Sequence, residues 1–323
     1  MDIVVTGSIA VDYLMSFPGY FKDHILPDKI DRLSVSFLVD GLTIRRGGCA
    51  ANIAYNLALL GERPRLFAAA GYDFGEYRQW LESCGVDCSA VVEVQDVATA
   101  SFFVNTDRAG SQIASFYTGA MAHASTLSFR KHLPCLPEIA IISPNDPQAM
   151  AQYVAECQVL GIRYIYDPSQ QIIRLTAEEL RAGVRGCYIL IVNEYEFEML
   201  REKTGLDEAA ILASAEALII TRGEHGSTIQ TRDARHAIPP LPERRIADPT
   251  GVGDAYRAGL LKGIALGADW ELAGTMGSLA ATYALEEQGS QSHHYTPAEF
   301  VARLRASYDD HGRLEVLCGV PSA

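Results

Sequence analysis

The second half of the chain alternates short apolar segments with longer segments of helical periodicity, and this alternation constrains the fold more than any other feature. Segments rich in Ile, Val and Tyr predict strands at residues 139–143, 163–166, 188–192 and 217–221. Apolar residues at helical spacing predict helices at 147–160, 176–182, 194–204, 252–265, 270–284 and 297–306, with a hairpin formed by 226–230 and 235–238. Strands that alternate with helices form a parallel sheet with helices on both faces. The sequence therefore predicts an α/β fold with a doubly wound, mostly parallel sheet.

The first half begins in the same way and then departs from this alternation twice. Residues 3–7 predict a buried first strand. Residues 13–45 then contain several turn residues and an apolar alternation at 33–39, and residues 98–118 alternate again. We expect these two insertions to carry short strands that pair as a small β-sheet lid on a single domain spanning 1–323.

Composition limits the partners that such a chain can have. The 323 residues are 48% apolar, which supports a large core, and carry a net charge of −13. This charge argues against nucleic-acid and acidic-membrane binding, both of which need a basic surface. Seven cysteines without paired spacing, and an N-terminus without a basic segment before an apolar one, predict reduced thiols, no signal peptide and a cytoplasmic location.

Chemistry is most concentrated between Asp248 and Gly259, which read DPTGVGDAYRAG. Gly251 and Gly253 allow close approach of the backbone, and a helical pattern follows them. The unpaired N–H groups of a helix start form an anion site. Asp254 would repel a phosphate there but could take a proton from an attacking hydroxyl, as in phosphoryl transfer. Taken alone, the run favours a structural N-cap; it is neither a Walker A loop nor a dinucleotide fingerprint.

A second glycine-rich segment lies at residues 46–71. Gly47 and Gly48 open a predicted helix at 50–60, and Gly61 ends it. Asn52 falls on the first turn, where its amide could point at a ligand or simply cap the helix.

Together these segments resemble the two signatures of the ribokinase family of carbohydrate and nucleoside kinases, also called the phosphofructokinase-B type. The first signature matches at Gly47, Gly48, Ala50, Asn52, Ala54, Gly61 and Gly71, and the second at Asp248, Pro249, Gly251, Gly253, Asp254, Ala258 and Gly259. The chain departs mildly at Val252, where many members have Ala, and at Tyr256, where Phe is usual. Five further segments are similar to bacterial adenosine kinases of the mycobacterial type: 1–12, 34–40, 112–121, 167–171 and 193–196.

The resemblance implies a ribokinase-like fold and an ATP- and Mg²⁺-dependent kinase acting on a nucleoside 5′-hydroxyl, with adenosine as first candidate, as in purine salvage. It implies Asp254 as base, with an anion hole formed by the amides of Gly251, Val252 and Gly253. Residues expected at the sugar are Ser8, Asp12, Gly47, Gly48 and Asn52. Residues expected at ATP are Asn193, Thr221, Gly223 and Gly226. Expected cation contacts are Asn193 and Glu196 for Mg²⁺ through water, and Asp248 and Thr250 for a monovalent cation such as K⁺.

The residues themselves leave the substrate open. Asp12 suits a vicinal ribose diol because a carboxylate has paired acceptors, although a turn aspartate is equally compatible. Phe102 and Phe116 could stack on a purine or pack inside the lid. Gln170 and Gln171 match adenine's donor and acceptor edge, or belong to a solvated loop.

The alternatives are a sugar kinase of the same family and a nucleoside-binding protein without turnover. A homodimer through the lid is also expected. We assign the adjacent pair His293 and His294 to a surface loop, and the close pair Cys84 and Cys88 to ordinary thiols, because no further metal ligand is near either pair in the sequence.

Overall fold

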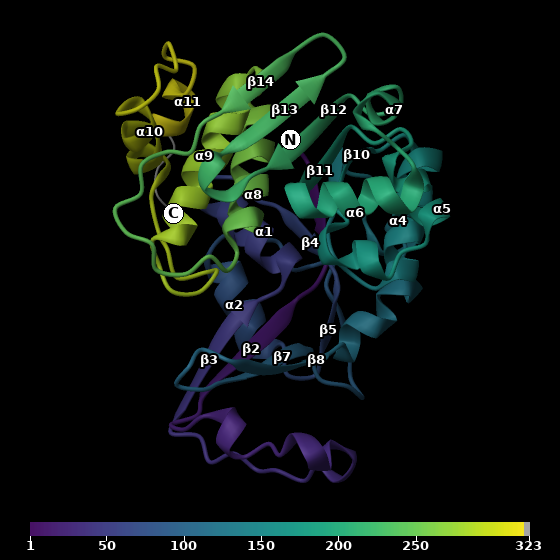
Figure 1. The fold of residues 1–323 in the computed structure, drawn as a ribbon. Coiled ribbons are helices and arrows are strands. Elements are labelled where there is room, and N and C mark those ends of the chain that lie inside the picture. Colours follow the sequence, from purple (N-terminus) through teal and green to yellow (C-terminus); the bar gives the residue numbers. More distant parts are fainter. Residues whose placement is uncertain (320–323) are drawn as a thin grey trace.

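A computed structural model describes residues 1–319 and places an eight-stranded sheet at the centre of the molecule (Figure 1). The strand order is β14-β13-β12-β11-β10-β9-β1-β4. The bounds are β1 Ile3–Thr6, β4 Arg65–Phe67, β9 Ile139–Ile142, β10 Arg163–Tyr166, β11 Ile189–Asn193, β12 Ala217–Thr221, β13 Ser227–Thr231 and β14 Arg235–Ile238. Pairing is parallel from β4 to β12 and antiparallel for the last two strands. The predicted doubly wound, mostly parallel sheet is confirmed.

Helices cover both faces of this sheet. The bounds are α1 Cys49–Leu59, α2 Gly75–Ser83, α3 Phe129–His132, α4 Pro147–Leu160, α5 Ala177–Val184, α6 Glu194–Thr204, α7 Glu208–Leu212, α8 Val252–Ala265, α9 Trp270–Leu285, α10 Pro297–Arg305 and α11 Glu315–Cys318. One buried cluster joins α3 to α7 with one sheet face, and a second joins α1, α2, α8 and α9 with the other. Within residues 1–319, no helix has the length and apolarity needed to cross a membrane.

The continuous apolar runs of the central strands follow from this two-sided burial. Strand β9 reads Ile-Ala-Ile-Ile, and all four residues are buried because helices lie on both faces. Capping residues determine where the flanking helices begin and end. Helix α4, for example, begins with the Asp146 side chain accepting from the N–H groups of Gln148 and Ala149, and it ends at Gly161 in the left-handed region.

The lid is a separate four-stranded sheet of order β3-β2-β7-β8, with the segment 17–40 extending from it (Figure 1). Its strands are β2 Ala10–Ser16, β3 Gly41–Gly47, β7 Ala100–Thr106 and β8 Gln112–Tyr117. The predicted pairing of the two insertions is therefore confirmed. Strand β2 begins three residues after the loop residue Gly7 that follows β1, so the lid grows from the carboxyl edge of the main sheet.

One predicted strand of the lid is wrong. Residues 33–39 form no strand, and β3 lies just after them. Their alternation does not mark a half-buried sheet surface, because Leu33, Val35 and Leu38 are exposed. Phe37 instead packs against Phe21, with ring centroids 4.8 Å apart.

Helix α2 is not predicted from the sequence, and neither are β4, α3, α7, α11 and the short strands β5 Ala69–Gly71 and β6 Val92–Val94. Only Tyr77 and Leu81 of the short helix α2 are buried, and it contains few apolar residues. It nevertheless supplies side chains that support the site described next.

Candidate active site

Several polar residues, among them the predicted Ser8, Asn193 and Thr221, lie at the carboxyl edge of the parallel sheet. Ser8 follows β1, Asp167 follows β10, and Asn193 and Thr221 end β11 and β12. Asn193 and Thr221 are register partners on neighbouring strands. Open α/β sheets bind ligands at this edge.

The start of α8 presents unpaired backbone donors. Gly251 has φ of 79°, and a Cβ there would lie 2.5 Å from the Cβ of Ser290, so only glycine fits. Within residues 1–319 the N–H groups of Gly251 and Gly253 donate no hydrogen bond, and that of Val252 makes only a long one of 3.4 Å to the Pro249 carbonyl. This geometry fits the predicted anion hole.

Asp254 lies on the first turn of α8, beside these amides. Its Oδ2 accepts a hydrogen bond of 2.8 Å from Asn52 Nδ2. Burial raises the pKa of the Asp254 carboxyl, while Arg257 and the Asn52 hydrogen bond oppose that rise. A carboxyl with a raised pKa is a better proton acceptor at neutral pH than an exposed one.

Asn52 is held by contacts on both sides, which its sequence context does not predict. Its Oδ1 accepts from Gln291 Nε2 at 3.0 Å, and Gln291 also contacts Tyr77 Oη. All three side chains are buried. The amide predicted to point at a ligand thus orients Asp254 in this structure. The helical spacing of Tyr77, Trp80 and Leu81 could have indicated α2, but nothing in the sequence indicates that Tyr77 and Gln291 support Asn52.

Glycines bring the lid aspartate against the start of α1. A Cβ on Gly47 would lie 2.7 Å from Asp12 Oδ2, and one on Gly48, whose φ is 95°, would lie 2.6 Å from the Ser8 carbonyl oxygen. The Ser8 hydroxyl accepts from the N–H of Cys49 at 3.0 Å and so caps α1.

Asp12 is half-buried in β2 and keeps its acceptors free. Neither of its oxygens accepts a hydrogen bond from the described residues, 1–319. Burial raises its pKa to about 6, with Arg45 opposing and Asp248 adding to the rise. A partly desolvated carboxylate without internal donors is suited to accept hydroxyl groups from a ligand.

Asp248 has the opposite character, because its carboxylate is fully engaged. Its Oδ2 accepts from Arg45 Nη1 at 2.9 Å and from the Gly289 N–H at 3.0 Å, and its Oδ1 accepts from the Thr250 N–H at 2.9 Å. Despite burial, these donors lower its pKa. In this conformation the lid residue Arg45 places a positive charge at Asp248.

The lid aromatics lie in one row with Asp12. Phe102 pairs with Asp12 on one side and with Phe116 on the other, so all three share a face of the lid sheet. Phe116 is 49% exposed. Phe103 points to the opposite face and stacks on Tyr13 with centroids 4.8 Å apart. The rings of Phe102 and Phe116 thus lie on the same face of the lid as Asp12, as stacking on a bound base requires.

The predicted nucleotide residues form two turns. Asn193 and Glu196 make a reciprocal capping box at the start of α6, with both hydrogen bonds at 2.8 Å. Glu196 Oε1 also accepts from Ser169 Oγ at 3.1 Å. The segment 222–226 links β12 to β13, and a Cβ on Gly226 would lie 2.1 Å from a carbonyl oxygen.

Gln170 and Gln171 lie in a short 3-10 turn, Ser169–Ile173, after β10. Gln170 is exposed and accepts from Ser169 Oγ at 2.8 Å, whereas Gln171 is buried with its Oε1 unpaired. No contact yet assigns either amide to a base edge. The described residues contain no group of three or more His, Cys, Asp or Glu side chains placed to hold a metal ion.

The histidine pair lies in a loop with His294 exposed, as predicted, but His293 is not at the surface. His293 is buried, and its Nε2 lies 2.7 Å from Asn56 Oδ1. Burial, with His294 nearby, lowers its pKa to about 4, so the ring is neutral. The side chain serves as a hydrogen-bonded core residue beside Tyr55.

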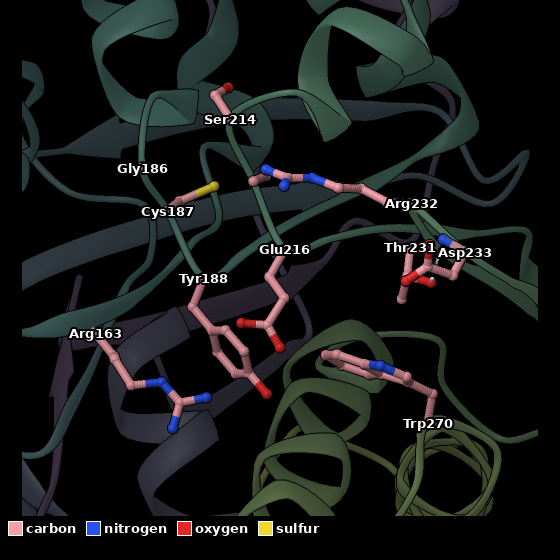
Figure 2. A pocket seen from close by; sticks show the side chains of 11 residues that line it. Arg163, Gly186, Cys187, Tyr188, Ser214, Glu216, Thr231, Arg232, Asp233 and Trp270 are labelled. Atoms are coloured by element: carbon pink, nitrogen blue, oxygen red, sulfur yellow. Dashed lines mark hydrogen bonds between the residues drawn. The ribbon is translucent and has the colours of Figure 1, made fainter.

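A pocket of about 540 Å³ lies elsewhere, at the opposite edge of the sheet (Figure 2). It is lined by Arg163, which starts β10, and by Tyr188 and Glu216, which precede β11 and β12. Arg163 lies 3.8 Å from the Tyr188 ring centroid. None of the predicted site residues lines it, so it is separate from the candidate active site.

The chain is similar to known kinases along most of its length. A model of the pfkB family carbohydrate kinases matches residues 11–297. The chain belongs to this family. It is 30% identical over 312 residues to a nucleoside kinase of Methanothermobacter thermautotrophicus, covering 95% of this chain and 96% of that protein. Among solved structures it is similar to Burkholderia thailandensis nucleoside kinase in complex with inosine (36% identity, TM-score 0.84, 95% and 98% coverage) and to Methanocaldococcus jannaschii nucleoside kinase (28%, 0.85, 95% and 99%). The B. thailandensis protein is also solved in complex with ADP-inosine (37%, 0.82, 95% and 96%).

Membership accounts for the two glycine signatures and for the lid, and it confirms the predicted ribokinase-like fold. The structure also explains how the chain accommodates Tyr256 where Phe is usual in the second signature. The Tyr256 ring is buried, and its hydroxyl lies 2.7 Å from Ser227 Oγ, so the extra oxygen has a partner on β13.

Proposed function

We propose that this protein is a nucleoside kinase that transfers the γ-phosphoryl group of ATP to the 5′-hydroxyl of a purine nucleoside. The observation that carries the proposal is Asp254, hydrogen-bonded by Asn52 beside the unpaired amides of Gly251 and Gly253. Similarity to nucleoside kinases along nearly the whole chain supports the substrate class.

Each part of the site has a role in this proposal. Asp254 takes the proton from the 5′-hydroxyl as it attacks. The amides of Gly251, Val252 and Gly253 stabilise the charge of the transferred group. Asp12 accepts from the ribose hydroxyls, and Phe102 and Phe116 cover the base. Catalysis then rests on positioning and electrostatics.

The nucleotide is proposed to lie at the turns after β11 and β12, near Asn193, Thr221, Gly223 and Gly226. Magnesium accompanies ATP and neutralises phosphate charge. Glu196 fits such an ion through water, since its oxygens keep free lone pairs beside their hydrogen bonds, and magnesium retains several waters.

Adenosine is the first candidate substrate, with inosine next because the B. thailandensis relative is solved with inosine. A sugar kinase is the alternative. A coupled ADP-release assay over adenosine, inosine, guanosine, cytidine, ribose and fructose tests the proposal. We expect purine nucleosides to turn over best; turnover of ribose or fructose without any nucleoside would leave a kinase but refute this substrate class.

Replacing a lid ring separates stacking from packing. Phe116→Leu is expected to raise KM for adenosine about tenfold, because it removes a flat aromatic contact and part of its buried area. The matched control is Phe103→Leu, on the same sheet but the opposite face, which should leave KM unchanged. Equal effects of the two variants in steady-state kinetics would place the base elsewhere.

Arg45 predicts how the activity responds to potassium. Because its guanidinium already faces Asp248, we expect turnover of the wild type to be the same in K⁺ and in tetramethylammonium salts. The Arg45→Met variant should turn over more slowly than the wild type when K⁺ is absent. Added K⁺ should bring its turnover back to the wild-type value. Strong K⁺ dependence of the wild type would mean that Arg45 leaves Asp248 in the working enzyme.

A homodimer through the lid is proposed from the face opposite Asp12. That face exposes five large apolar side chains: Leu42, Ile44, Phe103, Ile113 and Tyr117. Grouped exposed apolar residues commonly mark an interface. Sedimentation equilibrium should give a dimer for the wild type and a monomer for Ile44→Glu; a monomeric wild type would refute the proposal.

A further inference from the structure

Arg257 lies one turn after Asp254 on α8 and carries a charge that no predicted site residue accounts for. It is 7% exposed. Helical side chains lean toward the helix N-terminus, and this one folds back under the first turn. A Cβ on Gly253 would lie only 2.8 Å from Arg257 Nη1, so the guanidinium occupies the space directly beside an anion-hole residue.

Asp167 fixes this guanidinium from the loop after β10. Arg257 Nη2 donates to Asp167 Oδ1 at 2.5 Å, and Nε lies 2.5 Å from Asp167 Oδ2. One hydrogen bond and one close ionic contact to the same carboxylate thus hold the position of the guanidinium. Nη1 donates no hydrogen bond to the rest of the described chain, so it remains directed toward Gly253.

The surrounding charges are mostly negative. Asp254, Asp167 and Glu196 are close enough to raise the pKa of Arg257, although burial by itself would lower it. Three carboxylates against one guanidinium would repel the polyanionic nucleotide that the proposed function requires. Buried cations near a phosphoryl group act strongly because little water screens them.

We propose that Arg257 is an electrostatic positioning residue of the phosphoryl-transfer site: held by Asp167, it keeps a fixed positive charge beneath the amides of Gly251–Gly253 and beside Asp254. This inference rests on the proposed kinase activity but not on the identity of the acceptor. It assigns Asp167 the role of holding the arginine.

The charge acts on the base as well as on the anion hole. The groups that face Asp254 are Asn52 and Cys49 from α1, Asp167 from the loop after β10, and Arg257 from its own helix. The thiol of Cys49 stays neutral because burial raises its pKa. Arg257 is thus the group that opposes the buried carboxylates. Removing it should raise the pKa of Asp254 and reduce the fraction of ionised base at neutral pH.

The test compares Arg257→Gln with Lys262→Gln on the same helix. Lys262 is also buried and paired, with its Nζ 2.6 Å from Glu62 Oε1, but it faces away from the site. For Arg257→Gln we expect kcat to fall about 100-fold or more with KM for the phosphoryl acceptor changed less than threefold, and the acid limb of the pH–kcat profile to move to higher pH. Lys262→Gln should lower Tm but leave kcat and the pH–kcat profile unchanged.

Two further variants separate electrostatics from folding, since Arg257→Gln leaves Asp167 buried without a partner. Asp167→Asn keeps the arginine charge but loosens its position, so it should lower kcat less than Arg257→Gln does, whereas the double variant Arg257→Gln/Asp167→Asn should resemble Arg257→Gln. Recovery of wild-type kcat in the double variant would overturn the proposal and make the pair purely structural.

A readout independent of turnover is the ¹³C chemical-shift titration of the Asp254 carboxyl, assigned with Asp254→Asn. Its pKa should be higher in Arg257→Gln than in the wild type; an unchanged pKa in the folded variant would overturn the proposal. If the wild type phosphorylates a sugar rather than a nucleoside, the substrate proposal fails while the same variants, assayed on that sugar, still test Arg257.

Discussion

Asp254→Asn is expected to lower kcat by roughly 10²–10⁴-fold while leaving the fold and the nucleoside affinity intact, since general-base removal typically costs this much. The amide keeps an oxygen that can still accept from Asn52 Nδ2, so the local geometry is preserved. Only the proton acceptor is lost. Stopped assays of ADP release, together with nucleoside binding by calorimetry, measure the two quantities separately.

The matched control is Asp269→Asn. Asp269 also stands at a helix start, where its Oδ1 accepts from the Leu272 N–H at 2.9 Å, but it caps α9 away from the site. Asparagine is as good a cap as aspartate. This control should retain full kcat. An Asp254→Asn enzyme with more than half of the wild-type kcat would remove Asp254 from the mechanism.

The second large effect is expected at Asp12. Asp12→Asn should weaken binding of adenosine by roughly 1.5–3 kcal/mol, the value of a hydrogen bond to a charged group. Binding of 2′-deoxyadenosine should change much less, because that ligand lacks the hydroxyl proposed to donate. Equal losses for the two nucleosides would place Asp12 away from the ribose 2′ position.

Asp12 also predicts a pH dependence. Because its pKa is raised to about 6, the carboxylate is ionised at neutral pH and becomes protonated as the pH falls through that value. Affinity of the wild type for adenosine should therefore decline on the acid side of pH 6, and that decline should be absent in Asp12→Asn. A wild-type affinity that stays constant from neutral pH down to the ordinary carboxyl range would contradict this assignment.

The sequence was most informative where the backbone itself forms the site. Gly48 and Gly251 both have positive φ and lie where a Cβ would collide with another segment. Such positions demand glycine, so spacing alone marks them. The parallel sheet was equally predictable from the sequence, because strands buried on both faces must be apolar throughout.

Side-chain partnerships between distant segments could not be predicted in this way. Asn52 bonds Asp254, and Arg257 bonds Asp167, across 202 and 90 residues of chain. Nothing in the local pattern of a polar residue indicates which partner the fold will bring to it. The buried His293 was misjudged for the same reason, since its partner Asn56 lies on α1.

Amphipathic patterns also failed where burial is slight. The segment 33–39 alternates but stays exposed, and α2 is a true helix with little apolar content. Periodicity reports the side chains that an element buries, so it misleads where packing involves few of them.

The central claim, phosphoryl transfer to a nucleoside 5′-hydroxyl, is tested most directly by identifying the product. Wild-type protein with ATP, Mg²⁺ and adenosine or inosine, followed by ³¹P NMR, should yield the nucleoside 5′-monophosphate and ADP in equal amounts, and nothing from 5′-deoxyadenosine. ADP formed without any nucleoside 5′-monophosphate, or phosphorylation of ribose or fructose alone, would contradict the claim.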